Sequence, residues 1–394
     1  MKISELAKQI PESMTLAISA KAKQLKAEGR SIVAFTAGEP DFDTPDFIKQ
    51  EAKNALDKGI TKYTPASGMI SLKKAISEKL KKDNGLDYAP DQIIISSGAK
   101  SSLYYSMLAV LDPGDEVIIP NPIWLTYPEL VKLCGAKPVF VNTKKTGYKL
   151  TAQDLQAAIT GKTKLLILNT PCNPTGAVYG KDELRALADV IVKNDIMVLS
   201  DEIYEKLVYG EKHVSIASLG EEIKKRTVLV NGMSKSYSMT GWRVGYTAAE
   251  REVIKAMTNI QSHAAGNTCS IAQYASVKAI EEGELFTIES QKLFAARRRL
   301  LVECAKRLPM VEYVEPQGAF YLFMNVSAYY GKSYNGRVID GSLAFAECLL
   351  DEGVALIPGL PFGDDDCVRL SYAVSENDIT EGFARIAAFL KKLA

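Results

Sequence analysis

Between residues 92 and 230, short apolar runs alternate with segments that have helical periodicity. Apolar runs without polar alternation predict strands that are buried on both faces, which is typical of a mostly parallel sheet with helices on each side. Such sheets bind ligands at the loops beyond their strand ends. The predicted strands are a run from Gln92 and residues 117–119, 138–141, 164–168, 196–200 and 227–230, and the predicted helices are 101–111, one from about 127, 152–159 and 181–194.

The two ends of the chain lack this regular alternation of strands and helices, and they predict a second, smaller α+β unit. Its expected helices are 16–29, 284 to about 307, 343–352 and one from 376, and its expected strands are 32–35, 318–324, 354–357 and 367–371. Helices are also expected at 46–58 and 69–83. A chain of 394 residues exceeds the roughly 250–300 residues of a single core. We therefore expect a large domain of residues 44–283 and a small domain of residues 1–43 with 284–394.

Charge and cysteine content argue against several classes of protein. With 48 basic and 47 acidic residues, the chain has no bulk attraction to nucleic acid or to a membrane surface, and Arg297–Arg299 is predicted to be a solvated helix face. No apolar run approaches the ~20 residues of a membrane span, and Met1–Glu5 lacks a leader pattern. The six cysteines form no Cys-x-x-Cys pair and predict reduced thiols. These features favour a cytoplasmic protein.

The chain contains only two histidines, His213 and His263. Each lies far from any other cluster of ligand-type residues, so we expect no metal site and no Ser-His-Asp triad.

Polar side chains follow three successive predicted strands. Asn173 lies in the segment after residue 168, Asp201 and Tyr204 come directly after residue 200, and Lys235 and Arg243 follow residue 230. Because parallel strands end at one edge of the sheet, these side chains should converge in one cleft. Earlier in the chain, Ser96–Lys100 connects a strand to a helix N-terminus, and such a turn favours an anion.

This set suits pyridoxal phosphate chemistry, in which a lysine holds the cofactor as a Schiff base. Asp201 would keep the pyridine nitrogen protonated, since an ion pair favours both charged forms. Tyr204 and Asn173 would bind the ring's 3-oxygen. Arg243 and the Gly98-Ala99-Lys100 turn would hold the phosphate.

Three motifs give the chain a specific resemblance to a known family. They are Asn173-Pro-Thr-Gly176, Asp201-Glu-Ile-Tyr204, and Ser234-Lys235 followed by Thr240-Gly-Trp-Arg243. With them the whole chain resembles the fold-type I pyridoxal phosphate-dependent aminotransferases of the aspartate aminotransferase family. The resemblance implies an α/β fold with a mostly parallel seven-stranded sheet in a large domain, a smaller α+β domain, amino acid and 2-oxo acid substrates, and a homodimer with shared active sites.

The same resemblance implies roles for further residues. Lys235 would carry the cofactor and later move the substrate proton, with Asp201 and Tyr204 as its catalytic partners. Trp124 would stack on the cofactor ring, Arg369 would bind the substrate α-carboxylate, and Gly38 would lie over the substrate. Beyond these, Tyr63 would reach the phosphate in the neighbouring subunit, Asn173 would contact substrate as well as cofactor, and cis prolines would fall at Pro122 and Pro174.

The chain also departs from the family pattern. Gly232 and Gly98 stand where many relatives have a serine near the phosphate. Phosphate binding would therefore depend on Arg243, Tyr63 and backbone N–H groups, with Ser234 as an additional donor.

The N-terminal segment Thr36-Ala-Gly-Glu-Pro-Asp-Phe42 resembles that of bacterial aspartate aminotransferases. In that branch Lys100 would bind the distal carboxylate together with Ser13 and Thr15. Aspartate with 2-oxoglutarate is thus the expected substrate pair. Aromatic amino acids, prephenate or alanine remain alternatives, as does a lyase of the same fold. A transcription regulator is disfavoured, because no residues remain for a DNA-binding domain.

Overall fold

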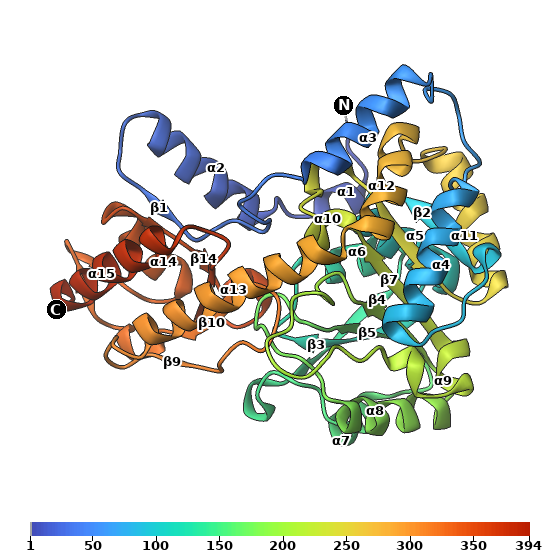
Figure 1. The fold of residues 1–394 in the computed structure, drawn as a ribbon. Helices are drawn as coiled ribbons and strands as arrows, with labels where there is room; N and C mark the ends of the chain where they lie inside the picture. The colour runs from blue at the N-terminus through green and yellow to red at the C-terminus, as the bar shows by residue number, and fades with distance from the viewer. Residues whose placement is uncertain (1) are drawn as a thin grey trace.

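The computed structural model describes residues 2–394, and a seven-stranded sheet forms its larger part (Figure 1). Every neighbouring pair in this sheet is parallel except those that involve β8, which is antiparallel to both β2 and β7. The predicted mostly parallel seven-stranded sheet is confirmed. In spatial order its strands are β2 (Ile93–Ser96), β8 (Gly245–Ala248), β7 (Thr227–Gly232), β6 (Met197–Asp201), β5 (Thr163–Asn169), β3 (Glu116–Asn121) and β4 (Lys137–Asn142).

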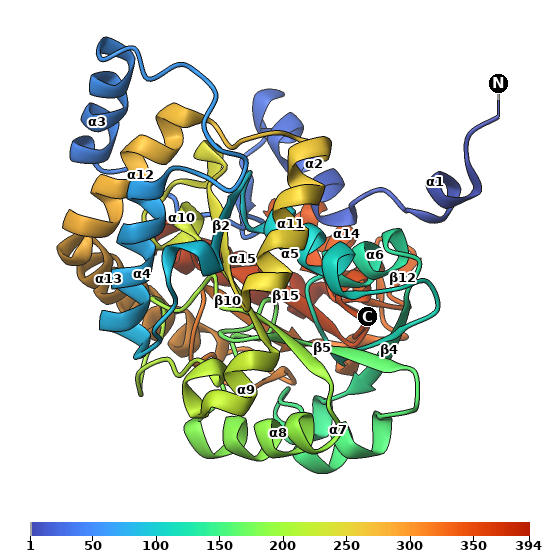
Figure 2. The same cartoon turned by 90° about the vertical axis from the view of Figure 1, so that its right-hand side faces the viewer.

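Helices cover both faces of this sheet because its strands are apolar on both faces. Val117 and Ile119 of β3 belong to a core shared with α5 and α6, whereas Ile118 packs in the core of α7, α8 and α9. Figure 2 shows α7, α8 and α9 together along one side of the molecule. The helices of this part are α3 (Asp46–Asp57), α4 (Ile70–Asn84), α5 (Ala99–Val110), α6 (Thr126–Leu133), α7 (Ala152–Ala158), α8 (Lys181–Lys193), α9 (Glu221–Arg226), α10 (Met233–Ser236), α11 (Arg251–Ala264) and α12 (Ser270–Glu282).

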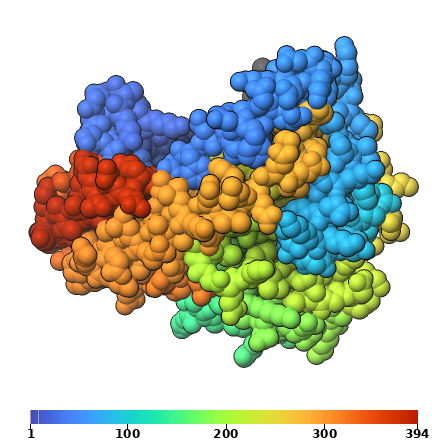
Figure 3. Space-filling view, in the orientation of Figure 1, coloured from blue at the N-terminus to red at the C-terminus, as the bar shows by residue number. Residues whose placement is uncertain are grey.

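A second, smaller group of elements comes from the two ends of the chain. The N-terminal strand β1 pairs with β13, and a four-stranded antiparallel sheet has the order β14-β15-β10-β9. Figure 3 shows the N-terminal segment in blue resting against the C-terminal segment in red. Its elements are α1 (Glu5–Gln9), α2 (Met14–Ala27), β1 (Val33–Ala34), β9 (Glu312–Tyr313), β10 (Tyr321–Asn325), β11 (Ser333–Tyr334), β12 (Arg337–Val338), α14 (Ser342–Asp351), β13 (Val354–Ala355), β14 (Ile357–Pro358), β15 (Cys367–Ser371) and α15 (Glu376–Lys392).

The 22-residue helix α13 (Glu284–Ala305) runs between the two groups (Figure 1). Its Phe294 is fully buried and stacks on Phe320, with ring centroids 5.4 Å apart. The prediction that Arg297 belongs to a solvated face is wrong: its guanidinium is buried and binds both carboxylate oxygens of Asp41 at 2.6 and 2.9 Å. An arginine run next to a distant carboxylate cannot be distinguished from a surface run by sequence spacing.

Other local predictions also need correction. The Gly-, Ser- and Thr-rich segment after residue 230 predicts a loop, but Lys235 lies in the one-turn helix α10. The predicted strand 354–357 is divided into β13 and β14 at Leu356. Pro122 and Pro174 follow cis peptide bonds as expected, and Pro171 forms a third.

All six cysteines are free thiols, as expected. None of the helices in residues 2–394 has the length and apolar character of a membrane span.

Candidate active site

A cavity of about 410 Å³ opens at the carboxyl ends of the parallel strands, between the large sheet and the small one. Asn169, Asp201 and Gly232 are the last residues of the adjacent strands β5, β6 and β7. The cavity is lined by Ser13, Thr15, Leu16, Ser19, Thr36, Gly38, Ala99, Lys100, Trp124, Leu125, Thr126, Tyr127, Asn169, Asn173, Asp201, Ile203, Tyr204, Ser234, Lys235, Arg243, Tyr321 and Arg369. The structure therefore brings together nearly all of the sequence-predicted site residues.

Lys235 projects from α10 into this cavity, and its ammonium donates to the carbonyl oxygen of Gly38. Burial lowers the pKa of Lys235 to about 8; Glu39 opposes this shift and the guanidiniums of Arg243 and Arg369 reinforce it. A lysine with this pKa has a substantial neutral fraction near neutral pH, which an exposed lysine lacks. The side chain is thus suited to act as a nucleophile and as a base.

Asp201 ends β6 and is almost completely buried. The Tyr127 hydroxyl donates to its Oδ2 at 2.6 Å, and the Ile203 N–H donates to its Oδ1 at 3.2 Å. Burial raises the pKa of Asp201 to about 6 in spite of these two donors. A buried carboxylate held in this way favours a positively charged partner in the cavity. Sequence reasoning missed Tyr127, which was only the start of a predicted helix.

The N-terminus of α5 and Arg243 form a cradle for an anion. The first N–H groups of a helix have no helical acceptors, and Ala99 and Lys100 are the first two residues of α5. The preceding Gly98 has φ +88°, and a Cβ there would collide with the Arg243 guanidinium. Gly98 itself is not one of the cavity-lining residues, whereas the buried Ser234 is. Only glycine allows this close approach of arginine to the helix end.

Arg369 lies in the middle of β15 and is buried. Its guanidinium donates to Asn173 Oδ1 at 3.0 Å and to the Thr36 carbonyl at 3.2 Å, and it lies 4.5 Å from the centroid of the Tyr321 ring. Within residues 2–394 no carboxylate forms an ion pair with it, and its Nε has no acceptor. A buried cation in this state is costly, so the site is complementary to an anion.

The Tyr204 hydroxyl hydrogen-bonds the Tyr321 hydroxyl at 2.9 Å, and both rings are buried. Burial raises the pKa of both phenols, so each remains a neutral donor at ordinary pH. Tyr321 is a second site residue that sequence reasoning missed. It lies in an apolar strand, and only the fold brings its hydroxyl into the cavity.

Lys100 also lines the cavity, and its ammonium lies 5.0 Å from the centroid of the Trp124 ring. Partial burial, with the Arg243 guanidinium nearby, lowers the pKa of Lys100. The hydroxyls of Ser13 and Thr15, at the start of α2, lie 3.0 Å from each other. The cavity lining thus offers the cation of Lys100 and these two hydroxyls besides Arg369.

Tyr63, unlike most of the predicted site residues, does not line the cavity. It is 97% exposed and belongs to the loop between α3 and α4. In this chain alone it contacts none of the other site residues by a hydrogen bond.

His213 does not lie apart from acidic groups, so that expectation is wrong. Its Nε2 is 2.9 Å from Glu202 Oε2, and its possible ligand atoms and those of Glu202 and Glu205 all lie within 4.8 Å of one another. However, Glu205 binds the ammonium of Lys79, and Glu202 accepts from two serine hydroxyls. These partners already satisfy the carboxylates, and the group carries no metal assignment here.

Residues 30–386 match the family "Aminotransferase class I and II". The chain belongs to this family. It is 45% identical to "Aspartate aminotransferase" of Bacillus subtilis, with all of both chains covered, and 44% identical to "Probable aspartate/prephenate aminotransferase" of Aquifex aeolicus, with 97% and 96% covered. Among solved structures, an aspartate aminotransferase from Rhizobium meliloti has a TM-score of 0.96 at 42% identity over the whole of both chains. One from Thermus thermophilus with maleate has a TM-score of 0.93 at 39% identity, with 99% and 100% covered.

The protein is therefore an aminotransferase of fold type I that uses pyridoxal phosphate and acts on amino acids and 2-oxo acids. The cavity fits this cofactor on three counts. The Gly98–Arg243 cradle suits a phosphate dianion, the buried Asp201 suits a pyridinium nitrogen, and Lys235 has the lowered pKa of a lysine that forms a Schiff base.

The raised pKa of Asp201 predicts a pH dependence of stability in the cofactor-free protein. Its folded pKa of about 6 lies above the ordinary value of 3.8. Between these values the folded state keeps a proton that the unfolded chain has lost, so the free energy of unfolding falls as pH rises. Asp201→Asn removes this loss, and we expect it to gain about 2 kcal/mol relative to the unmodified protein between pH 4 and pH 6.5.

Urea unfolding of the cofactor-free proteins across this pH range measures the difference. Asp340→Asn, at an exposed position, serves as the control and should follow the unmodified protein. Parallel pH profiles for Asp201→Asn and the control would contradict the assignment of the raised pKa to Asp201.

Proposed function

We propose that this aminotransferase transfers the α-amino group of aspartate to 2-oxoglutarate, with oxaloacetate and glutamate as products. The observation that carries the proposal is the presence of two cations that line one cavity from different elements, Lys100 on α5 and Arg369 on β15, besides Lys235 and the arginine of the phosphate cradle. Two carboxylates on a short substrate require two such cations. The names of the Bacillus subtilis relative and of the Thermus thermophilus structure with maleate, itself a four-carbon dicarboxylate, support this choice.

Arg369 would bind the α-carboxylate, which amino and oxo acid substrates share. Its planar guanidinium can form two parallel hydrogen bonds with a carboxylate. Asn173 and Tyr321 hold the guanidinium before substrate arrives. Because the cation is already buried, the carboxylate would replace missing interactions and would not have to displace a protein anion.

Lys235 would move the proton of the reaction. Bound pyridoxal phosphate supplies an electron sink for the pair of electrons left at the substrate Cα when its proton departs. Once released from the cofactor, the neutral Lys235 amine would take that proton from Cα. The pKa of about 8 makes the amine neutral in a useful fraction near neutral pH. The Gly38 carbonyl, which accepts from the ammonium, would hold the side chain over the substrate.

The remaining polar residues would hold the cofactor in place. Asp201, oriented by Tyr127, would bind the pyridine nitrogen as an ion pair. Tyr204 and Asn173 would donate to the ring oxygen, and Trp124 would cover the ring face. The phosphate would lie on the N-terminus of α5, beside the Gly98 turn, with backbone N–H donors from Ala99 and Lys100 and side-chain donors from Ser234 and Arg243.

Removal of Lys235 should abolish the reaction. We expect Lys235→Ala to lower the rate of amino-group transfer from aspartate by on the order of 10⁴-fold, because Lys100, the other lysine of the cavity lining, is proposed to bind the distal carboxylate and not to move the proton. Single-turnover absorption of the cofactor after mixing with aspartate gives this rate. Substantial turnover in Lys235→Ala would sink the assignment of its role.

A lysine that does not line the cavity provides the control for Lys235. Lys255→Ala, on the surface of α11, should react as fast as the unmodified protein. Formation of elimination products without a 2-oxo acid acceptor, in any of these proteins, would favour the lyase alternative.

Lys100 should determine the preference for acidic substrates. With Ser13 and Thr15 it would bind the distal carboxylate of aspartate. We expect Lys100→Met to lower kcat/KM for aspartate by about 100-fold, which corresponds to the loss of one charge-assisted hydrogen bond pair. For alanine, which has no second carboxylate, the change should stay within about threefold.

The comparison of the two substrates decides the role of Lys100. If the variant loses aspartate and alanine activity equally, Lys100 acts on the cofactor or the fold and not on the distal carboxylate. If an aromatic amino acid is the best donor of the unmodified protein, the aspartate proposal fails while the aminotransferase chemistry stands.

Prephenate is a second candidate substrate. The Aquifex aeolicus relative is named an aspartate/prephenate aminotransferase, and prephenate also carries two carboxylates. The same two cations would bind it. Its larger body distinguishes it from 2-oxoglutarate as an amino acceptor, and a comparison of the two acceptors in the steady state measures the preference.

We also propose that the protein is a homodimer in which Tyr63 completes the phosphate site of the partner. An aromatic residue that is 97% exposed is unusual in an isolated chain, and its hydroxyl has no role in its own cavity. The proposed division into residues 44–283 and residues 1–43 with 284–394 places this loop in the large domain. The cytoplasmic location is likewise a proposal, supported by six free thiols.

Mixed dimers test the sharing of sites. Tyr63→Ala should bind the cofactor weakly, and Lys235→Ala should be inactive, but a hybrid of the two has one site with both native residues. We expect re-association of an equal mixture to restore about one quarter of the normal number of sites. Activity no higher than the sum of the separate variants would exclude a shared site.

A further inference from the structure

Two walls of the cavity belong to different sheets. Trp124 lies just after β3 of the large sheet, whereas Arg369 lies on β15 of the small sheet. The segments that carry them meet beside the cavity. The Ile123 N–H donates to the Phe362 carbonyl at 3.1 Å, and Asn121 Nδ2 donates to the Gly363 carbonyl at 2.7 Å.

Glycine is required at this meeting point. Gly363 has φ +88°, and a Cβ there would collide with the side-chain amide of Asn121. The two segments are therefore as close as backbone and side chain allow.

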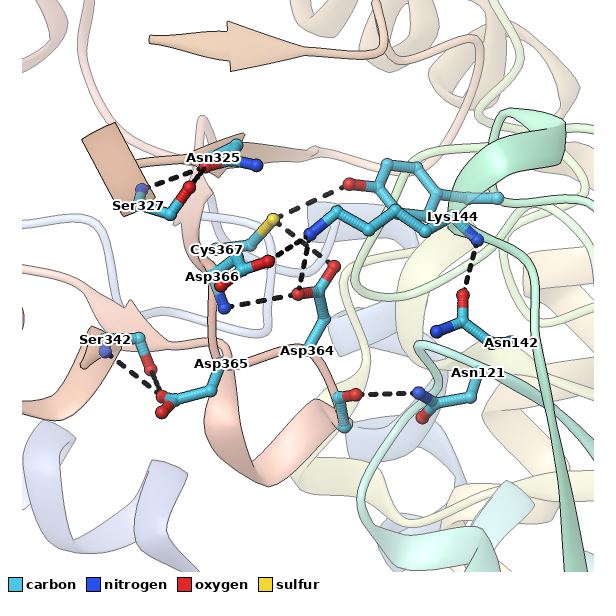
Figure 4. A network of polar contacts seen from close by, with 12 residues as sticks. Asn121, Asn142, Lys144, Asn325, Ser327, Ser342, Asp364, Asp365, Asp366 and Cys367 are labelled. Carbon is cyan, nitrogen blue, oxygen red and sulfur yellow. Dashed lines mark hydrogen bonds and ion pairs between the residues drawn. The ribbon is translucent and has the colours of Figure 1, made fainter. Parts of the chain in front are cut away.

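Among the residues that the structure describes, Lys144 forms the only ion pairs across this junction. It follows β4 of the large sheet, and its ammonium lies 3.1 Å from Asp364 Oδ1 and 2.6 Å from Asp366 Oδ2 (Figure 4). The side chain of Asp364 is 9% exposed and that of Lys144 is 31% exposed. Ion pairs of this partly buried kind are screened less by salt than surface pairs.

The two aspartates lie in the loop that leads into β15, the strand of Arg369. Asp366 precedes β15, and Asp364 Oδ1 accepts from its N–H at 3.2 Å. In the same loop, the ring of Phe362 lies 5.0 Å from the Arg369 guanidinium. Without Lys144, two neighbouring carboxylates would face each other across one short loop with no cation between them, which is unfavourable.

We propose that Lys144 is a positioning residue, which fixes the 359–366 loop and the start of β15 so that Arg369 faces the cavity opposite Trp124. It thereby sets the affinity for the carboxylate common to all substrates, without contact to substrate or cofactor. This inference rests on the proposed role of Arg369.

The test uses the cofactor-loaded enzyme and succinate, a dicarboxylate with no amino group to transfer. We expect Lys144→Met to raise the dissociation constant of succinate and the KM for aspartate about tenfold. The value of kcat should change less than about twofold, because the lost interaction acts on substrate binding and not on the proton transfer. The affinity for pyridoxal phosphate should stay unchanged.

Two variants control for charge and for folding. Lys145→Met removes the same charge from the neighbouring exposed residue and should bind succinate normally. Lys144→Arg keeps a cation at the junction and should restore the affinity to within about threefold. If Lys144→Met fails to fold, Asp366→Asn removes one half-exposed partner and should shift the affinity in the same direction by a smaller factor.

Normal succinate binding in Lys144→Met, or an equal loss in Lys145→Met, would overturn the positioning role. A fall in kcat or in cofactor affinity as large as the change in KM would overturn it too, since both indicate a general structural effect. Arg369→Lys separates the two proposals. If that variant binds succinate as tightly as the unmodified enzyme, the assignment of Arg369 to the substrate carboxylate fails first.

Discussion

A buried guanidinium without a carboxylate partner is expensive, and the structure places Arg369 in this state where its two sheets meet. The surroundings reduce the cost in part: an amide oxygen, a backbone carbonyl and a tyrosine ring lie against the cation. They supply no negative charge. The free energy that remains unrecovered is available to a ligand with a carboxylate. The fold thus provides a preformed carboxylate site, because the buried guanidinium of Arg369 has no anionic partner of its own.

At Asp201, in the region proposed for the cofactor, the buried group is a carboxylate and not a cation. Among residues 2–394, a hydroxyl and an N–H are the only donors to this buried carboxylate, and its pKa rises to about 6. Lys235 lines the same cavity, and burial lowers its pKa to about 8. Each group is thus moved toward its neutral form by the same desolvation. A cofactor with a cationic ring nitrogen and an anionic phosphate would restore the ionic state of the carboxylate and occupy the cradle at α5.

Sequence patterns predict the sheet and the chemical core of the site because both depend on local rules. Apolar strands without alternation reveal a sheet buried on both faces. Asp201 is the last residue of one such strand, and Lys235 lies in the short helix that follows another. The site roles drawn from the resemblance remain proposals. Features that depend on distant contacts were missed: the Tyr321 hydroxyl meets Tyr204 across 117 positions, and Arg297 meets Asp41 across 256. No periodicity in either segment signals its partner, so the arginine appeared solvated and the tyrosine appeared to be core.

The reversed direction of β8 has a consequence for the geometry of catalysis. Because β8 is antiparallel to β7, the chain turns back at the ligand edge and needs no crossover helix before the next strand. Lys235 and Arg243 consequently lie on one short connecting segment, and the pairing of Gly232 with Gly245 fixes its two ends. Their separation is set by local chain geometry, whereas Asp201 is placed by the register between strands. A change in strand register would therefore displace the Asp201 carboxylate first. The distance between Lys235 and Arg243 would stay the same.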